Sequence, residues 1–209
     1  ICLSTGNSSY SSAGIGVPPV FIVVCKNIKL SRLVYDWLAM DNPPPGVPKS
    51  GLSDFLNTPQ RENTIRVDST VEEDAWMRFT LDTVGRRDWS RDTMGRPLYP
   101  EGFVELAEKL KKPFHPPGRD VRAIISVGML TEGWDCNTVT HIVGLRPFMS
   151  QLLCEQVVGR GLRRRSYVPD PETDRFEPEY AEVYGVPFAF ISGEPEGGTE
   201  KPKMPAVEV

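Results

Sequence analysis

Residues 20–25 read VFIVVC, an unbroken apolar run made mostly of β-branched side chains. Such a run is typical of a strand that is buried on both faces, as in a parallel sheet. The apolar residues that follow it recur at helical spacing: Leu30, Leu33, Val34, Trp37 and Leu38. The Asn-Pro-Pro-Pro-Gly segment at 42–46 ends that pattern. The stretch therefore predicts a strand followed by a helix.

The same alternation continues along the chain. Apolar patterning predicts further strands at residues 64–68, 122–127 and 140–145, and helices at residues 101–111 and 150–162. Strands that alternate with helices indicate an α/β fold, in which a mostly parallel sheet is flanked by helices.

One more helix is predicted to begin after the strand at 64–68. Ser69 with Glu72, or Thr70 with Glu73, has the spacing of a capping box. The acidic residues up to Asp74 suit the positive N-terminus of that helix, so they need no role in nucleotide chemistry.

Composition divides the chain into an ordered domain and two flanking segments. Residues 1–18 carry no charge and are rich in Ser and Gly, so we expect a flexible lead-in. The domain itself is expected to span residues 19–166, with an irregular insertion at 41–63. Residues 167–209 form an acidic tail whose apolar run at 186–191 predicts one more strand.

The overall composition excludes several classes of protein. The 209 residues are 39% hydrophobic and 25% charged, with a formal net charge of -4, which fits a soluble domain with its own core. No apolar run approaches the roughly 18 residues of a membrane-spanning helix. The four cysteines form no Cys-x-x-Cys pair and there are two histidines, so no metal site is expected. We expect a cytoplasmic protein without a membrane partner.

A first candidate site lies at residues 126–135, which read SVGMLTEGWD. The pattern predicts a strand that runs into a tight turn, where Gly133 lets the backbone approach a ligand and Asp135 offers an acceptor. An ordinary strand-to-helix connection with a capping Asp explains these residues equally well.

A second candidate lies at residues 156–165, QVVGRGLRRR. On a continuous helix Gln156, Arg160 and Arg163 share one face, because they stand at i, i+4 and i+7. Guanidinium groups match phosphate oxygens bidentately, so two on one face suit a nucleotide or a nucleic-acid backbone. The alternative is a solvated basic helix end.

Together, Gln-x-x-Gly-Arg-x-x-Arg at 156–163 and Thr-Glu-Gly-Trp-Asp at 131–135 resemble motifs VI and V of superfamily 2 helicases. The amino-acid sequence around residues 156–163 is similar to that of the helicase subunit of type III restriction enzymes. The run at 19–25 stands where that family has motif IV, so the resemblance spans residues 19–191. It implies the second RecA-like domain of an ATP-dependent DNA helicase or translocase.

The resemblance also implies roles for single residues. Arg160 and Arg163 would meet the γ-phosphate of ATP in an open cleft, packing against nothing, with Arg163 favoured as the arginine finger and Gln156 orienting the contact. The nucleotide-binding residues that it implies are Gly133, Asp135 and Gly159. Those implied for nucleic acid are Val127, Gly128 and Thr131. Val127 replaces the usual Thr of motif V, which leaves backbone N–H groups to donate hydrogen bonds to a nucleic-acid phosphate.

The sequence contains no Gly-Lys-Ser/Thr triplet and no acidic magnesium motif after an apolar strand. The resemblance therefore implies half of a motor, inactive alone, whose ATP and Mg²⁺ are held by an N-terminal RecA-like domain. The implied partners are double-stranded DNA, that N-terminal domain and a methyltransferase (modification) subunit. The alternatives are a non-catalytic module that binds nucleic acid or a partner, and the same motor half in a DNA-repair helicase.

One further segment stays open. Residues 82–100 mix four arginines with three aspartates, which fits either a solvated loop or an edge that faces phosphates.

Overall fold

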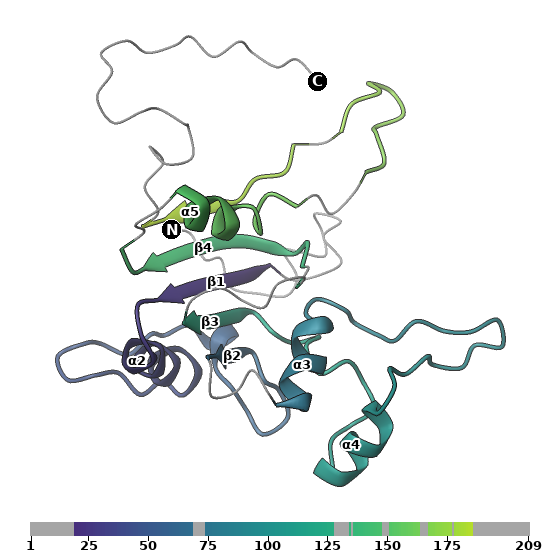
Figure 1. The fold of residues 1–209 in the computed structure, drawn as a ribbon, viewed down its shortest axis with the longest axis horizontal. Helices are drawn as coiled ribbons and strands as arrows, with labels where there is room; N and C mark the ends of the chain where they lie inside the picture. The colour runs from purple at the N-terminus through teal and green to yellow at the C-terminus, as the bar shows by residue number, and fades with distance from the viewer. Residues whose placement is uncertain are drawn as a thin grey trace.

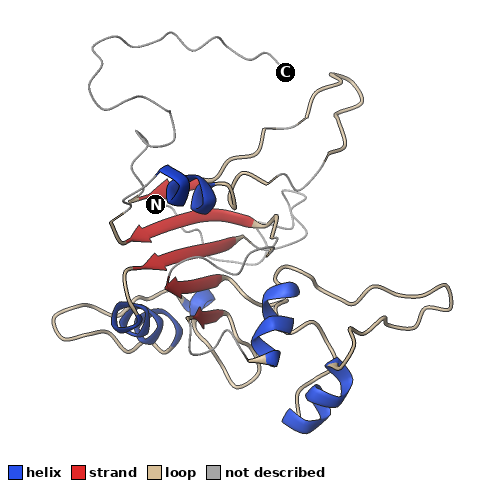
Figure 2. Ribbon diagram, in the orientation of Figure 1, coloured by secondary structure: helices blue, strands red, loops and turns tan. Residues whose placement is uncertain are grey.

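The computed structural model describes residues 19–68, 74–127, 134, 136–147, 151–163, 167–176 and 178–185. Its centre is a five-stranded sheet in the order β2-β3-β1-β4-β5. All four strand pairs are parallel, and Figure 2 shows the arrowheads on the same side. The strands are β1 (Val20–Cys25), β2 (Thr64–Val67), β3 (Ala123–Val127), β4 (Val139–Leu145) and β5 (Glu182–Tyr184). The predicted α/β fold with a parallel sheet is confirmed.

Helices cover both faces of this sheet (Figure 1). The helical segments are α2 (Ile28–Ala39), the 3-10 turn η1 (Ser53–Phe55), α3 (Ala75–Asp82), α4 (Phe103–Leu110) and α5 (Gln151–Val158). The α2 face of β1 carries Val23 and Cys25, while Ile22 and Val24 face the cluster that includes residues of α3 and α5. This period-two alternation within one apolar run is why β1 is buried on both sides.

The two candidate motifs meet on the α3 and α5 face. β1 is central, with β3 on one side and β4 on the other, so the segments that follow β3 and β4 start from its two neighbours. Trp134 and Cys136 from the first segment share a buried cluster with Cys154 and Val157 of α5. Residues that lie 20 positions apart in the sequence are therefore packed together.

The start of α3 differs from the predicted cap. Its N-cap is Asp74, whose carboxylate accepts hydrogen bonds from the backbone N–H groups of Trp76 (2.8 Å) and Met77 (3.4 Å). The proposed pairs, Ser69 with Glu72 and Thr70 with Glu73, lie outside the described residues. A carboxylate at this place is stabilised by the helix dipole as well as by the two bonds.

Two boundaries in the C-terminal part were predicted wrongly. The helix that was expected to continue to residue 162 ends at Val158, and a turn follows. Strand β5, a short edge strand that pairs with β4, was not predicted at all because its three residues carry no apolar pattern. The apolar run at 186–191 lies outside the described residues.

Candidate functional site

The candidate site is the turn that follows α5, at residues 159–163. Cys154, Val157 and Val158 anchor the helix, since all three are buried against the sheet. The N–H of Gly159 still donates to Glu155 O in the helical pattern, at 2.8 Å. The next two donors, Arg160 N (3.3 Å) and Gly161 N (2.9 Å), bond only three residues back, so the chain tightens and leaves the helix.

Gly161 fixes where this turn lies. A Cβ added to it would stand 3.0 Å from Ala181 Cβ and 3.2 Å from Ile142 Cδ1, which is tighter than ordinary side-chain contact. The missing side chain therefore lets the turn lie directly on β4, next to the residue before β5. The turn that carries Arg160 and Arg163 is therefore packed against the sheet at Gly161.

Arg160 is turned inward, onto Trp134. Its Nη1 donates a hydrogen bond of 2.9 Å to the backbone carbonyl oxygen of Trp134. Its guanidinium carbon lies 5.3 Å from the centre of the Trp134 ring, within the range of a cation–π interaction. The expectation that Arg160 packs against nothing is wrong, because the helix ends before this residue and the turn redirects its side chain.

Trp134 links this turn to a third element. It is only 5% exposed, and its indole Nε1 donates to the carbonyl oxygen of Leu81 near the end of α3, at 2.9 Å. The segment between β3 and β4, the end of α3 and the turn after α5 are thus joined through one indole ring. No role was predicted for Trp134 from the sequence, although a large aromatic residue between Gly133 and Asp135 could have indicated a packing role.

Arg163 differs from Arg160 in its exposure. It lies on the surface, whereas Arg160 is partly buried. Burial lowers the pKa of Arg160, and the positive charge of Arg163 lowers it further, so the two guanidinium groups are close enough to repel each other. An anion placed between or beside them relieves that repulsion. The turn therefore combines an inner arginine, anchored on Trp134, with an outer one that reaches solvent.

The other predicted site residues are distributed as follows. Gln156 is exposed on α5, and Gly159 is the first residue after that helix. Val127 ends β3, and its side chain packs on the α2-side cluster rather than into solvent. Four predicted residues lie outside the described part of the chain: Gly128, Thr131, Gly133 and Asp135.

The anchoring of Arg160 leads to a stability prediction. Arg160→Ala removes a charge-assisted hydrogen bond and a cation–π contact, so we expect the free energy of unfolding to fall by about 1–3 kcal/mol. Arg163→Ala is the matched control, because it removes a positive charge from the same turn at an exposed position. It is expected to change stability by less than about 0.5 kcal/mol. Urea denaturation of both variants checks this, and equal losses would contradict the inward placement of Arg160.

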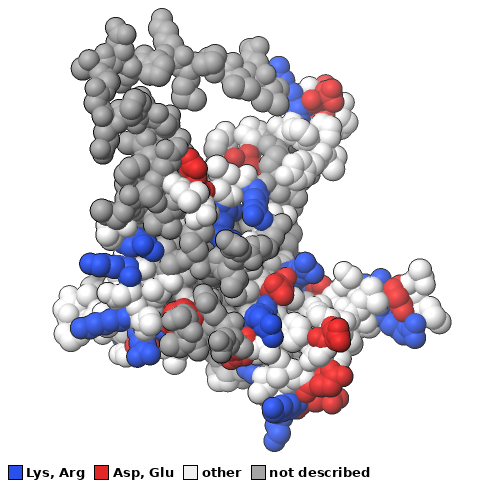
Figure 3. Space-filling view, viewed as in Figure 1, with Lys and Arg blue, Asp and Glu red and all other residues white. Residues whose placement is uncertain are grey.

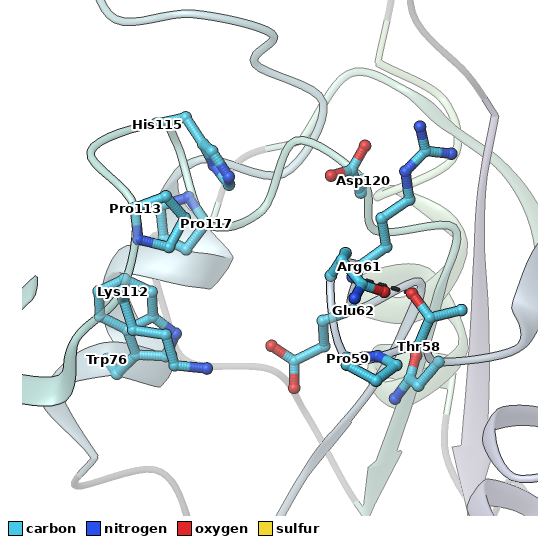
Figure 4. A pocket seen from close by; sticks show the side chains of 12 residues that line it. Thr58, Pro59, Arg61, Glu62, Trp76, Lys112, Pro113, His115, Pro117 and Asp120 are labelled. Atoms are coloured by element: carbon cyan, nitrogen blue, oxygen red, sulfur yellow. Dashed lines mark hydrogen bonds between the residues drawn. The ribbon is translucent and has the colours of Figure 1, made fainter.

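A separate hollow of about 220 Å³ lies at the amino ends of β2 and β3, away from this turn. Its walls come from residues 57–62, 112–120 and Trp76. Figure 4 shows the Glu62 carboxylate and the Lys112 ammonium extending toward each other across it. The Lys112 Nζ lies 5.7 Å from the centre of the Trp76 ring. The hollow was not predicted from the sequence, because the two loops that line it lie some 50 residues apart in the chain.

Burial of Glu62 in this hollow carries a cost in stability. Desolvation raises the pKa of Glu62; Lys112 opposes this shift and Asp74 adds to it. Since the folded pKa is above the unfolded one, charging Glu62 destabilises the fold at neutral pH, and this cost disappears below the unfolded pKa.

We therefore expect Glu62→Gln to raise the free energy of unfolding at pH 7, with the gain shrinking to nothing near pH 4. Urea denaturation at the two pH values measures it. Glu108→Gln, on the exposed side of α4, controls for the loss of one negative charge. A Glu62→Gln variant that is less stable than the parent at pH 7 would show that the carboxylate is stabilising where it stands.

Neither metal nor membrane features stand out in the described ranges. No three His, Cys, Asp or Glu side chains there gather into a group that would hold a metal ion. None of the helices found in those ranges is long and apolar enough to cross a membrane.

No known protein family and no curated protein matches this chain. Among solved structures it has a weak likeness to the ATP-dependent Type ISP restriction-modification enzyme LlaBIII bound to DNA, with 17% identity and a TM-score of 0.24. The match covers 86% of this chain and 12% of that one, so the chain spans about an eighth of that enzyme. At this level of similarity no role is transferred from it.

Proposed function

We propose that this chain is the second RecA-like half of an ATP-dependent DNA helicase or translocase of the type III restriction kind. The observation that supports it best is the joint between the two motif segments. Arg160 of one segment binds Trp134 of the other, and Arg163 reaches solvent beside it. A solvated basic helix end has no need of such a joint, whereas an arginine that must meet a phosphate accurately requires a positioned turn.

In this proposal the arginines have different tasks. Arg163 is the finger that meets the γ-phosphate of ATP bound by a partner RecA-like domain, since it is exposed and forked. Arg160 is a positioning residue that holds the turn on Trp134. The roles proposed for the other residues follow the resemblance: Gln156, Gly159, Gly133 and Asp135 would serve the nucleotide site, and Val127, Gly128 and Thr131 would serve the DNA strand, chiefly through backbone amides.

The partner domain supplies what this sequence lacks. It holds ATP and Mg²⁺ through a phosphate-binding loop and an acidic magnesium ligand, and the ion neutralises charge on the phosphates. Two neighbouring guanidinium groups on this chain fit the remaining need, a cation at the terminal phosphate. Double-stranded DNA and a methyltransferase subunit complete the proposed assembly.

The proposal is tested by measuring magnesium-dependent ATP hydrolysis with duplex DNA. The 209-residue chain alone is expected to show only background turnover, while a protein that joins it to a P-loop RecA-like domain hydrolyses ATP. Turnover by the chain alone would refute the half-motor role. A joined protein that binds DNA but never hydrolyses ATP would favour a non-catalytic binding module instead.

A further inference from the structure

The segment between α3 and α4 forms a projecting arm, which we define as residues 86–100. Figure 1 shows it extending away from the sheet, on the side opposite α2. Arg91 and Pro97 form an isolated antiparallel bridge within it. Backbone bonds of 2.7 Å from Leu98 N to Ser90 O, and of 2.9 Å from Asp92 N to Arg96 O, hold its two sides together. The arm is thus a narrow hairpin ribbon whose two sides meet at one isolated bridge.

The base of the arm is fixed to the protein by aromatic packing. Trp89 is 6% exposed, its ring centre lies 4.7 Å from that of Phe103 in α4, and its Nε1 donates to Phe114 O at 2.9 Å. Tyr99, on the returning side, stacks on the same Phe103 with the ring centres 5.9 Å apart. Both ends of the arm therefore rest on one buried ring, which gives the ribbon a defined direction.

The tip is a tight turn that exposes an apolar side chain. Asp92 Oδ1 accepts from the N–H groups of both Met94 and Arg96, at 2.9 Å each, and Gly95 takes a positive φ of 79°. Met94 is left 76% exposed at the end of the ribbon, and Leu98 is 54% exposed behind it. The tip is therefore a hydrogen-bonded turn that presents an apolar side chain to solvent.

The arm carries positive charge in a chain whose net charge is -4. It has four arginines against two aspartates, which leaves two positive charges. The aspartates are already paired, Asp88 with Arg91 and Asp92 with Arg96, each at 2.8 Å. Arg86 and Arg87 are exposed and form no ion pair among the described residues. Figure 3 shows both signs of charge along the arm at the right.

We propose that the arm enters a groove of duplex DNA, with its arginines on the phosphates and Met94 against the base pairs. Flanking arginines with an apolar wedge such as Met are a recurring way to engage the minor groove of duplex DNA, and the narrow hairpin presents both. An acidic protein surface would also match the charge and could accept the exposed Met. The choice of DNA as the polyanion rests on the proposed function.

The test is fluorescence anisotropy of the 209-residue chain with a labelled 30-base-pair duplex and its single strand, at rising KCl. We expect Arg86→Ala/Arg87→Ala to weaken duplex binding about tenfold or more at low salt. Each lost phosphate contact makes the slope of log K against log salt less negative by about 0.9. The slope of the double variant should therefore be less negative by about 1.8. Met94→Ser should weaken binding about threefold and leave the slope unchanged.

One control variant and two further outcomes make the test decisive. Lys109→Ala/Arg175→Ala removes two exposed charges elsewhere and should preserve the slope; an equal loss there would overturn the proposal, because the effect would be generic charge. Arm variants that lose only single-strand binding, or a chain that binds no duplex, would also overturn it. The anisotropy assay contains no ATP, so a failure of the arm to bind duplex is seen separately from a failure of the chain to support ATP hydrolysis.

Discussion

Replacing Arg163 by Ala, in a protein that joins this chain to a P-loop domain, is expected to lower DNA-stimulated ATP hydrolysis by about 100-fold or more. An arginine finger stabilises charge that develops on the transferred phosphoryl group, an effect worth roughly 10³–10⁵ in rate in related chemistry. Arg163 suits this task because it is exposed beside an arginine anchored at 2.9 Å to Trp134 O. Steady-state ATPase assays at saturating ATP and duplex measure the loss.

Two variants give this prediction its specificity. Arg163→Lys keeps the charge but loses the planar fork, so we expect activity to remain well below that of the parent. Lys109→Ala removes one exposed charge from α4 and should leave the rate within about twofold. Full activity in Arg163→Lys would reduce the role of Arg163 to a general positive field.

Gly118→Ala is expected to destabilise the fold by about 3 kcal/mol or more, because no flexible neighbour can give way. A Cβ at this buried position would collide with the carbonyl oxygen of Thr80 and lie 2.5 Å from Val84 N. Gly118 also donates its N–H to Thr83 Oγ1 at 2.9 Å, which ties the chain before β3 to the end of α3. Thermal or urea denaturation followed by circular dichroism measures the effect.

The control for this prediction is Gly46→Ala. That glycine has a φ of +83° but no atom within 4 Å of a new Cβ, so only the backbone cost of about 1–2 kcal/mol is expected. If the two substitutions proved equally mild, the segment around Gly118 would have to be packed less closely against α3 than the structure shows.

The sheet was largely predictable because its strands are buried on both faces. VFIVVC has no polar residue and the run that ends at Val127 has one, the buried Ser126, and each became a central strand. Strand β5 was missed for the opposite reason. Glu182–Tyr184 is an edge strand with exposed residues, so its pairing with β4 follows from tertiary position rather than from its own composition.

The sequence indicated both segments of the candidate site but not the orientation of its arginines. The spacing of Gln156, Arg160 and Arg163 implies one helical face only if the helix continues, and it stops at Val158. Gly159 and Gly161 allow the turn that sends Arg160 inward to Trp134. Helical periodicity cannot register a turn made by close packing on β4, so the division between an inner and an outer arginine required the structure.

The most direct measurement is the affinity of magnesium ADP–aluminium fluoride, a mimic of the phosphoryl transition state, for the joined protein by isothermal titration calorimetry. Transition-state mimics bind at least about 100-fold more tightly than ground-state ligands when the finger is in place. We predict that Arg163→Ala retains the affinity for ADP but loses most of the additional affinity for the mimic. Unchanged affinity of Arg163→Ala for the mimic would contradict the assignment of Arg163 to the γ-phosphate, and with it the role of this chain as a motor half.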